Sequence, residues 1–483
     1  MNGQRPNILL ILTDQQRYDT LAAYGFEAGC TPNLDGVAQD GVVFERAYCT
    51  SPLCTPSRAS MFTGDHLSGH GVERLYDSFD EERALFPEHL QRAGYRTALI
   101  GKLHVGSIIE EAERRHRRDG FDVYELCNEM TMHMASPLQA YSAWLADRDP
   151  EFRELLFERG REVTHYPAGL HMSHWAAERT VDFVRDAVAD EVPFFAAMSL
   201  FDPHNPYDGA PEGTEERLGS LPEPRPTPDE ALWPRGLRRE AASKQVEPHI
   251  RGTLEEARRG YHASIAFLDE QIGRVLAELE NQGVAENTLV IFTSDHGDML
   301  GDLGLMTKGA FFYDPCVRVP LLMRWPAALS PRTRVNPPVQ LNDIAATVLA
   351  AAGVDVDVLH ADSRDLVALA REGVEPRPYA VSCYRNGGLN IGGNTTYFNP
   401  PLLATMLCTS EHKLVIYHDT EAEDTGQLFD LSADPGEECD LWSEESHREV
   451  REELTRLMLD WLVRDSWAAG PRNGQCLPAS SRA

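Results

Sequence analysis

The hydrophobic positions of the chain fall into short continuous runs separated by amphipathic stretches. Residues 6–13 (PNILLILT), 96–100 (RTALI), 192–200 (VPFFAAMSL) and 288–293 (TLVIFT) are largely apolar, and residues 42–44 form a shorter run. Runs of this length and composition are typical of strands buried on both faces, as in a parallel sheet covered by helices.

Helical spacing of apolar residues occurs between these runs. It predicts helices over residues 31–38, 86–93, 253–281 and 343–352. Alternation of strands and helices is the pattern of an α/β domain. Residues 1–372 are therefore predicted to form a large domain with a mostly parallel central sheet flanked by helices.

The pattern changes in residues 373–483. Short alternating runs replace the long apolar ones, and an amphipathic helix is predicted over 445–463. We expect a smaller C-terminal domain, an antiparallel sheet packed with one helix. The expected strands are 379–384, 405–409 and 413–417.

Residues 205–250 interrupt the α/β pattern. They are rich in Pro, Glu and Arg. A long segment of this composition predicts a surface insertion within the larger domain.

The charge of the chain limits its partners. Of 483 residues, 45 are Lys or Arg and 76 are Asp or Glu, which gives a formal net charge of −31. Such a chain repels nucleic acid and anionic membrane surfaces, so neither is an expected partner. A substrate that is itself an anion would need a local pocket of positive charge.

Two further features concern the compartment. No apolar run is long enough to span a membrane, and the N-terminus lacks the pattern of a signal peptide. We therefore expect a cytoplasmic protein. The nine cysteines are an odd number and widely spaced, unlike a disulfide framework.

Chemically reactive residues follow four of the predicted strands: Asp14, Lys102 with His104, His204, and Asp295 with His296. In an open parallel sheet, ligands bind beyond the carboxyl ends of the strands. Two carboxylates brought together there repel unless a cation or a proton lies between them. A hard divalent ion suits oxygen ligands, and a histidine adds a nitrogen. The alternative is that each aspartate merely caps the turn that follows it.

The most specific local pattern is CTPSR at residues 54–58. Pro56 and Ser57 predict the start of a helix, whose free N–H groups and dipole favour an anion at Cys54. Arg58 adds a guanidinium suited to a tetrahedral oxyanion. The alternative is a buried cysteine ahead of a helix.

These residues resemble the sulfatase family. The run CTPSRASMFTG at 54–64 is similar to the first sulfatase signature, and GYRTALIGKLH at 94–104 is similar to the second. Further matching residues, in the family's order, are Asp14, Pro203-His204, Ser294-Asp295-His296-Gly297-Asp298 and Lys308. The resemblance places the chain in the alkaline phosphatase superfamily and implies a large α/β domain with a smaller C-terminal sheet domain.

The resemblance also implies a nucleophile and a metal. A formylglycine-generating enzyme would oxidise Cys54 to formylglycine, whose hydrate would be held on one divalent metal ion. Residue 54, Asp14, Asp295 and His296 would be ligands of this ion. One hydroxyl of the hydrate would attack the sulfur of a sulfate ester.

The remaining roles are implied in the same way. Arg58 and Lys102 would neutralise the transferring group, while His204 and Lys308 would protonate the leaving oxygen. His104 would take the proton of the second hydroxyl, so that the aldehyde re-forms and sulfate leaves.

The sequence departs from the family pattern at the predicted metal site. Gln15 stands where many sulfatases have a second Asp. Its carbonyl oxygen remains a candidate ligand, and we expect Ca²⁺, with Mn²⁺ or Mg²⁺ as alternatives. His296 stands where some members have Asn; the histidine form also occurs in choline sulfatases and in phosphonate monoester hydrolases.

The predicted function is hydrolysis of an aryl, alkyl or carbohydrate sulfate, with choline sulfate as a narrower variant. The alternatives are hydrolysis of a phosphonate monoester or phosphodiester at the same site, and a non-catalytic binding protein on the same fold. Related bacterial enzymes are often dimers or tetramers, so we also expect a homo-oligomer. His66 and His70 follow the signature; we predict solvated loop histidines, or else a place at the entrance of the site.

Overall fold

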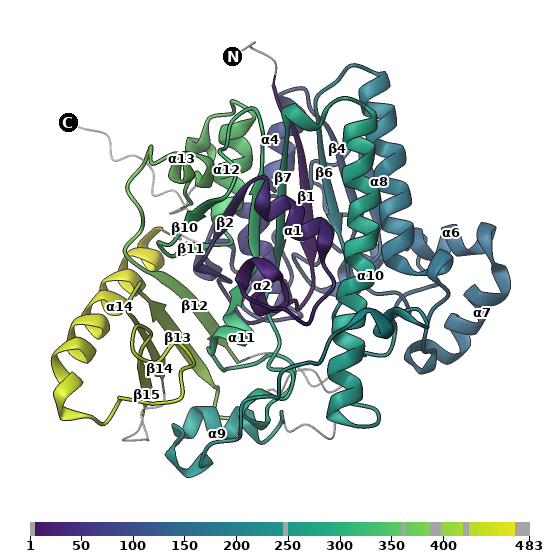
Figure 1. Cartoon of the computed structure of the whole chain (residues 1–483). Coiled ribbons are helices and arrows are strands. Elements are labelled where there is room, and N and C mark those ends of the chain that lie inside the picture. Colours follow the sequence, from purple (N-terminus) through teal and green to yellow (C-terminus); the bar gives the residue numbers. More distant parts are fainter. Residues whose placement is uncertain (1–4, 245–249, 360–362, 387–397, 419–424, 469–483) are drawn as a thin grey trace, which may run out of the picture.

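The structure is a computed structural model that describes residues 5–244, 250–359, 363–386, 398–418 and 425–468 (Figure 1). Its centre is an eight-stranded sheet. In spatial order the strands are β10 (Thr333–Val335), β2 (Val42–Phe44), β9 (Leu321–Arg324), β7 (Thr288–Ser294), β1 (Asn7–Thr13), β6 (Phe194–Ser199), β4 (Arg96–Gly101) and β5 (Val123–Leu126).

The central sheet is mostly parallel, as predicted. β1 lies between β6 and β7 and is parallel to both, and β4 is parallel to β5 and β6. The exception among the described strands is β9, which runs antiparallel to β2 and β7. The pairing aligns the carboxyl ends of the inner strands, since Thr13 pairs with Ser294 and Gly101 with Ser199.

Both faces of the sheet are covered by helices (Figure 1). Alternate residues of a strand point to opposite faces, so Ile8 and Leu10 belong to one hydrophobic core and Leu9 and Ile11 to another. The helices of the first core are α2 (Cys54–Thr63), α4 (Phe86–Arg92) and α12 (Asp343–Ala351), and those of the second are α1 (Pro32–Gln39), α8 (Met172–Ala189) and α10 (Leu254–Asn281).

A separate antiparallel sheet follows near the C-terminus, which confirms the predicted fold class. Its strands, in order, are β12 (Ala380–Arg385), β13 (Leu403–Cys408), β14 (His412–Tyr417) and β15 (Gly426–Asp430). Helix α14 (Arg448–Ala468) packs on this sheet through Leu454, Met458 and Trp461. The sequence prediction missed β15, and the boundary proposed at residue 372 stays a prediction.

Smaller elements connect these parts. A three-stranded sheet contains β11 (Val339–Gln340), β3 (Ala47–Tyr48) and β8 (Arg318–Val319), and the chain runs from β3 into α2. The short helices are α3 (Leu67–His70), α5 (Ile108–Glu113), α6 (Ala140–Arg148), α7 (Pro150–Arg159), α9 (Arg235–Ala241), α11 (Asp314–Val317) and α13 (Leu366–Ala370).

One prediction about exposure was wrong, and another stays a prediction. The segment 205–250, predicted as a surface insertion, includes Trp233, Leu237 and Ala241 around α9, which are buried in the first core; residues 245–249 lie outside the described part of the chain. His66 and His70 are not solvated, since each is only 5% exposed. His66 packs against Trp461 of α14, with ring centroids 5.0 Å apart, so distant segments cover both histidines.

None of the helices described is both long and apolar enough to cross a membrane. The described cysteines are all free, and Cys476 lies outside the described residues. Neither observation concerns the compartment in which the protein works.

Candidate active site

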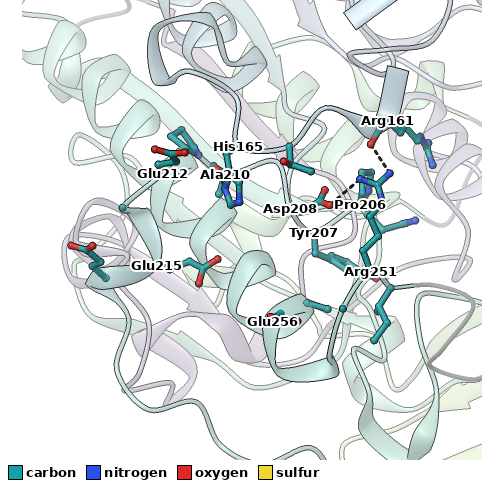
Figure 2. A pocket seen from close by; sticks show the side chains of 18 residues that line it. Arg161, His165, Pro206, Tyr207, Asp208, Ala210, Glu212, Glu215, Arg251 and Glu256 are labelled. Carbon is teal, nitrogen blue, oxygen red and sulfur yellow. Dashed lines mark hydrogen bonds and ion pairs between the residues drawn. The ribbon is translucent and has the colours of Figure 1, made fainter. Parts of the chain in front are cut away.

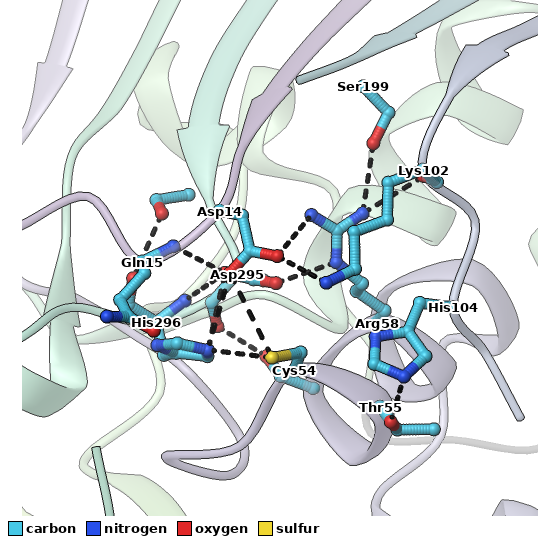
Figure 3. Close-up of polar contacts among 12 residues, drawn as sticks. Asp14, Gln15, Cys54, Thr55, Arg58, Lys102, His104, Ser199, Asp295 and His296 are labelled. Atoms are coloured by element: carbon cyan, nitrogen blue, oxygen red, sulfur yellow. Dashed lines mark hydrogen bonds and ion pairs between the residues drawn. The ribbon is translucent and has the colours of Figure 1, made fainter. Parts of the chain in front are cut away.

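The reactive residues at the strand ends meet beyond the carboxyl edge of the central sheet (Figure 3). Asp14 directly follows β1, Lys102 follows β4, and Asp295 follows β7. His204 lies a few residues beyond β6. All four are buried. Because β1, β4, β6 and β7 are parallel neighbours, the fold itself brings these side chains together.

Cys54 is the first residue of α2, with Leu53 as the N-cap. Its Sγ lies 2.9 Å from Lys308 Nζ, 3.3 Å from His296 Nε2 and 3.9 Å from Asp14 Oδ1. The helix was predicted to start at Pro56, and it starts two residues earlier. Cys54 therefore lies directly at the positive end of a helix dipole.

A divalent cation fits the donor set beside Cys54. Ligand atoms of Asp14, Cys54, Asp295 and His296 lie within 4.8 Å of one another, and all four residues are buried. His296 Nδ1 donates to the carbonyl of Gly297 at 2.9 Å, which leaves the lone pair of Nε2 directed at the cluster. Two carboxylates, an imidazole nitrogen and residue 54 form a suitable ligand set for one ion.

The Gln15 side chain lies beside this cluster and is held at both ends. Its Oε1 accepts a hydrogen bond from Lys308 Nζ at 2.7 Å, and its Nε2 donates to Asp298 Oδ2 at 2.6 Å. The carbonyl oxygen thus points toward Lys308 and Cys54. Whether it also binds metal stays a prediction.

Two cations lie on the other side of Asp14 and Asp295. The Arg58 guanidinium donates to Asp295 Oδ2 at 2.6 Å, to Ser199 Oγ at 2.9 Å and to the carbonyl of Lys102 at 3.1 Å. Its Nη2 has no hydrogen-bond partner among the described residues, although it is fully buried. The Lys102 ammonium donates to Asp14 Oδ2. A buried donor without a partner is costly, so an anion at this position would be stabilised.

Lys308 and His204 form a pair beside Cys54. Their Nζ and Nε2 atoms are 2.9 Å apart. His204 Nδ1 lies 2.7 Å from the carbonyl of Asn205, so Nδ1 carries the proton and Nε2 accepts from Lys308. Burial, together with Lys308, holds the pKa of His204 well below its usual value. The cationic member of the pair is therefore Lys308.

His104 lies on the loop after β4 with a positive φ of 55°. Its Nε2 lies 2.9 Å from Thr55 Oγ1, while its Nδ1 has no partner among the described residues. The buried carboxylate of Glu111 accepts hydrogen bonds from the backbone N–H groups of His104, Val105 and Gly106 at 2.8–3.2 Å. This carboxylate fixes the loop and so the place of the imidazole.

The electrostatics of the cluster favour an anion at residue 54. Burial and Asp14 favour the neutral thiol, but Lys308, Lys102 and His296 outweigh them and lower the pKa of Cys54. Burial likewise disfavours the charged form of Asp14, yet the cations Lys102, Lys308 and Arg58 hold its pKa well below the usual value. A negatively charged group can thus bind in a protein that is strongly acidic overall.

The sequence reasoning gave no role to several residues that contact this cluster. Asp298 was noted only as the last residue of the matching SDHGD run at 294–298. Ser199 lies one residue before the end of the strand predicted over 192–200. Glu111 carries no signal, because nothing local in the sequence shows that its carboxylate turns back to the loop of His104.

A cavity of about 880 Å³ is lined in part by the segment that follows His204 in the chain (Figure 2). Asn205 and Tyr207, which follow His204 in the chain, contribute to its wall. Arg251 also lines it, and donates to Asp208 Oδ2 at 3.0 Å and to the carbonyl of Arg161 at 2.6 Å. Charged side chains such as Arg251 and Asp208 line this cavity, and none of the cluster residues does.

Comparison with known proteins decides the family. The sulfatase family model matches residues 6–354. The chain belongs to the sulfatase family. This sulfatase is accordingly a sulfuric ester hydrolase.

Individual relatives cover almost the whole chain. The arylsulfatase of Clostridium perfringens is 29% identical over 480 residues, covering 94% of each chain. The N-acetylglucosamine-6-O-sulfatase of Bacteroides thetaiotaomicron is 25% identical over 521 residues, covering 94% of this chain and 86% of the relative. Among solved structures, the phosphonate monoester hydrolase of Agrobacterium radiobacter has the same fold, with a TM-score of 0.78 and 24% identity over 95% of this chain and 96% of that one.

Proposed function

We propose that this sulfatase hydrolyses a sulfate monoester to an alcohol and inorganic sulfate, with residue 54 as the nucleophile after oxidation of Cys54 to formylglycine. The observation that carries the proposal is the position of Cys54. It lies at the start of α2, between the cluster of Asp14, Asp295 and His296 and the cations that surround its Sγ.

Asp14, Asp295, His296 and residue 54 would hold one divalent ion, with Ca²⁺ expected and Mn²⁺ or Mg²⁺ as alternatives; Gln15 is a further candidate ligand. When bound, the ion supplies Lewis acidity, which polarises the sulfate group and lowers the pKa of the attacking hydroxyl. The short distances among these buried groups support this assignment.

The side chains around the cluster would each act at a definite atom. Arg58, through Nη2, which has no hydrogen-bond partner among the described residues, and Lys102 would bind the oxygens of the transferring group as negative charge develops there. Lys308 would donate its proton to the leaving oxygen, with His204 Nε2 in contact to share it. His104 would take a proton from residue 54 at the end of the cycle.

The alcohol part of the ester would extend past His204 toward the cavity lined by Asn205 and Tyr207. The cavity volume of about 880 Å³ would hold a group larger than a single ring, such as an oligosaccharide. Aryl, alkyl and carbohydrate sulfates, and choline sulfate as a narrower case, remain the candidate substrates.

Peptide mass spectrometry of the tryptic fragment 47–58, from protein made in its own host, tests the nucleophile. The fragment contains Cys49 and Cys54. Conversion of Cys54 alone to the aldehyde or its hydrate supports the proposal, and Cys49 is the internal control. An unmodified Cys54 in fully active protein would refute it.

A second candidate is hydrolysis of a phosphonate monoester or phosphodiester at the same site. It is favoured by Gln15 and His296, whose combination departs from the common sulfatase pattern, and the solved phosphonate monoester hydrolase shares the fold. Rates on an aryl sulfate, an aryl phosphonate monoester and an aryl phosphate diester, compared as kcat/KM, decide between the two.

A further inference from the structure

Lys308 depends on other parts of the chain for its place. Residues 306–313, on which it lies, contain no helix or strand. Thr307 directly before it has a φ of 57°, a strained conformation for a β-branched residue. Yet the Lys308 ammonium contacts Gln15, Cys54 and His204 at 2.7–2.9 Å. Surrounding structure must therefore determine the path of this loop.

The residues before Lys308 are held by Lys244, three positions after the end of α9. The carbonyl of Lys244 accepts from the backbone N–H of Met306 at 2.9 Å. Its ammonium group lies 3.4 Å from Thr307 Oγ1 and is completely buried. Lys244 thus contacts the backbone and a side chain immediately ahead of Lys308.

The residues after Lys308 are held by Glu240 of α9, which is also completely buried. A Cβ atom at Gly309 would lie 2.4 Å from Glu240 Oε1, so the carboxylate lies directly against this glycine. Among the described residues Oε1 has no hydrogen-bond partner, so its contact here is the close packing against Gly309. Glu240 and Lys244, four residues apart, therefore contact the residues directly after and directly before Lys308.

The C-terminal sheet contacts both Glu240 and the loop of Lys308. The Tyr384 hydroxyl of β12 donates to Glu240 Oε2 at 3.0 Å. The Tyr417 hydroxyl of β14 donates to the carbonyl of Ala310 at 2.9 Å, and its ring packs against Gly236 of α9. In Figure 1, α9 lies below the central sheet, near the C-terminal strands. The contacts run from this sheet through α9 to the loop of Lys308.

We propose that Glu240 and Lys244 are positioning residues that hold Lys308 against the leaving oxygen. They act through the loop rather than on the reacting atoms. The inference rests on the proposed function in one respect, the role of Lys308 at the leaving oxygen. It assigns a part in the reaction to the segment 205–250 and to the C-terminal sheet.

The test is the dependence of kcat/KM on the leaving group, over aryl sulfates from nitrophenyl (a good leaving group) to phenyl (a poor one). Lys308→Met removes the proton donor, so the loss grows as the leaving group becomes poorer. Glu240→Ala and Lys244→Met are expected to show the same trend, with a loss of about 10- to 100-fold for phenyl sulfate and several-fold less for nitrophenyl sulfate, as for a slightly misplaced catalytic group. In the Lys308→Met background, Glu240→Ala adds no further leaving-group dependence.

A purely structural role would lower all rates equally. Asp269→Ala is the matched control, because Asp269 is another buried carboxylate, which binds the backbone of Asn33 and Leu34 and no active-site loop. It should lower the melting temperature without changing the leaving-group trend. If Glu240→Ala does not fold, Tyr384→Phe removes only the hydrogen bond to Glu240 and should show a weaker form of the same trend.

The outcomes separate the inference from the proposed function. If the loss depends on the leaving group in Lys308→Met but not in Glu240→Ala, Lys244→Met or Tyr384→Phe, the inference is overturned and the proposed function stands. An unchanged trend in Lys308→Met overturns the role of Lys308 and the inference with it. Absence of hydrolysis of aryl, alkyl and carbohydrate sulfates alike in the mature wild-type protein would instead refute the proposed function.

Discussion

At the scale of single residues, the contacts of Arg58 can be made by no other residue type. Its separate nitrogens reach Asp295, Ser199 and the carbonyl of Lys102, and Nη2 remains for an anion. A lysine keeps the charge but offers one nitrogen in place of this planar fork. Arg58→Lys is therefore expected to lower kcat/KM on an aryl sulfate by about 100-fold or more, the effect of losing an oxyanion donor.

Ser199→Ala is the control for this prediction. It removes one acceptor, while Nη1 of Arg58 keeps the carbonyl of Lys102 as a partner. We expect a loss of less than about 10-fold, in the range of one ordinary hydrogen bond. Steady-state kinetics on the matured protein, with residue 54 verified by mass spectrometry, measures both. Near wild-type activity of Arg58→Lys would show that the guanidinium does not bind the transferring group.

At the scale of elements, the loop after β4 depends on one carboxylate. Glu111 accepts from the N–H groups of His104, Val105 and Gly106 and from Asn128 Nδ2. Glu111→Gln replaces one accepting oxygen with an amide donor, which opposes these N–H groups and displaces His104. Since His104 would act after the alcohol has left, we expect a burst of about one alcohol per active site, followed by turnover slowed about 10-fold or more.

Stopped-flow measurement of the released alcohol detects such a burst. Asp119→Asn is the matched control, since Asp119 is a buried carboxylate nearby that binds Arg115 and the N–H of Phe121. It touches neither His104 nor its loop, so no burst is expected. Uniformly slow turnover in Glu111→Gln, with no burst, would argue that the loop affects an earlier step.

The same elements explain what the sequence could predict. The apolar runs of β1, β4, β6 and β7 are buried on both faces, so their ends, with Asp14, Lys102 and Asp295, were predictable from local pattern. The residues that hold the active-site loops in place could not be predicted in this way. Glu240 contacts Tyr384 of β12 in the C-terminal sheet, and its helix has few apolar positions in a segment rich in Pro and Glu. Burial that depends on contacts so distant in the chain leaves no local signal.

At the scale of the whole molecule, buried histidines link stability to pH. His66 and His70 were predicted to be solvated, but α14 and neighbouring loops cover them, and burial lowers the pKa of each to about 3. For His262, burial and then Arg17 lower the pKa to about 3. These imidazoles remain neutral in the folded protein far into the acid range, whereas in the unfolded chain they bind protons near pH 6.5.

Between pH 6.5 and 3, therefore, the unfolded state holds more protons, and the free energy of unfolding falls as the pH falls. Each such histidine contributes a slope of about 1.4 kcal/mol per pH unit in this window and nothing above it. His262→Phe removes one of them and keeps an aromatic ring against Phe26, now 4.7 Å from the His262 ring centroid. Denaturant unfolding at pH 7.5, 5.5 and 4.5 should thus give a variant whose stability declines less steeply than that of the wild type, by about 1.4 kcal/mol per pH unit below pH 6. If the free energy of unfolding declined equally in the variant and the wild type, His262 would be protonated in the folded state as readily as in the unfolded chain.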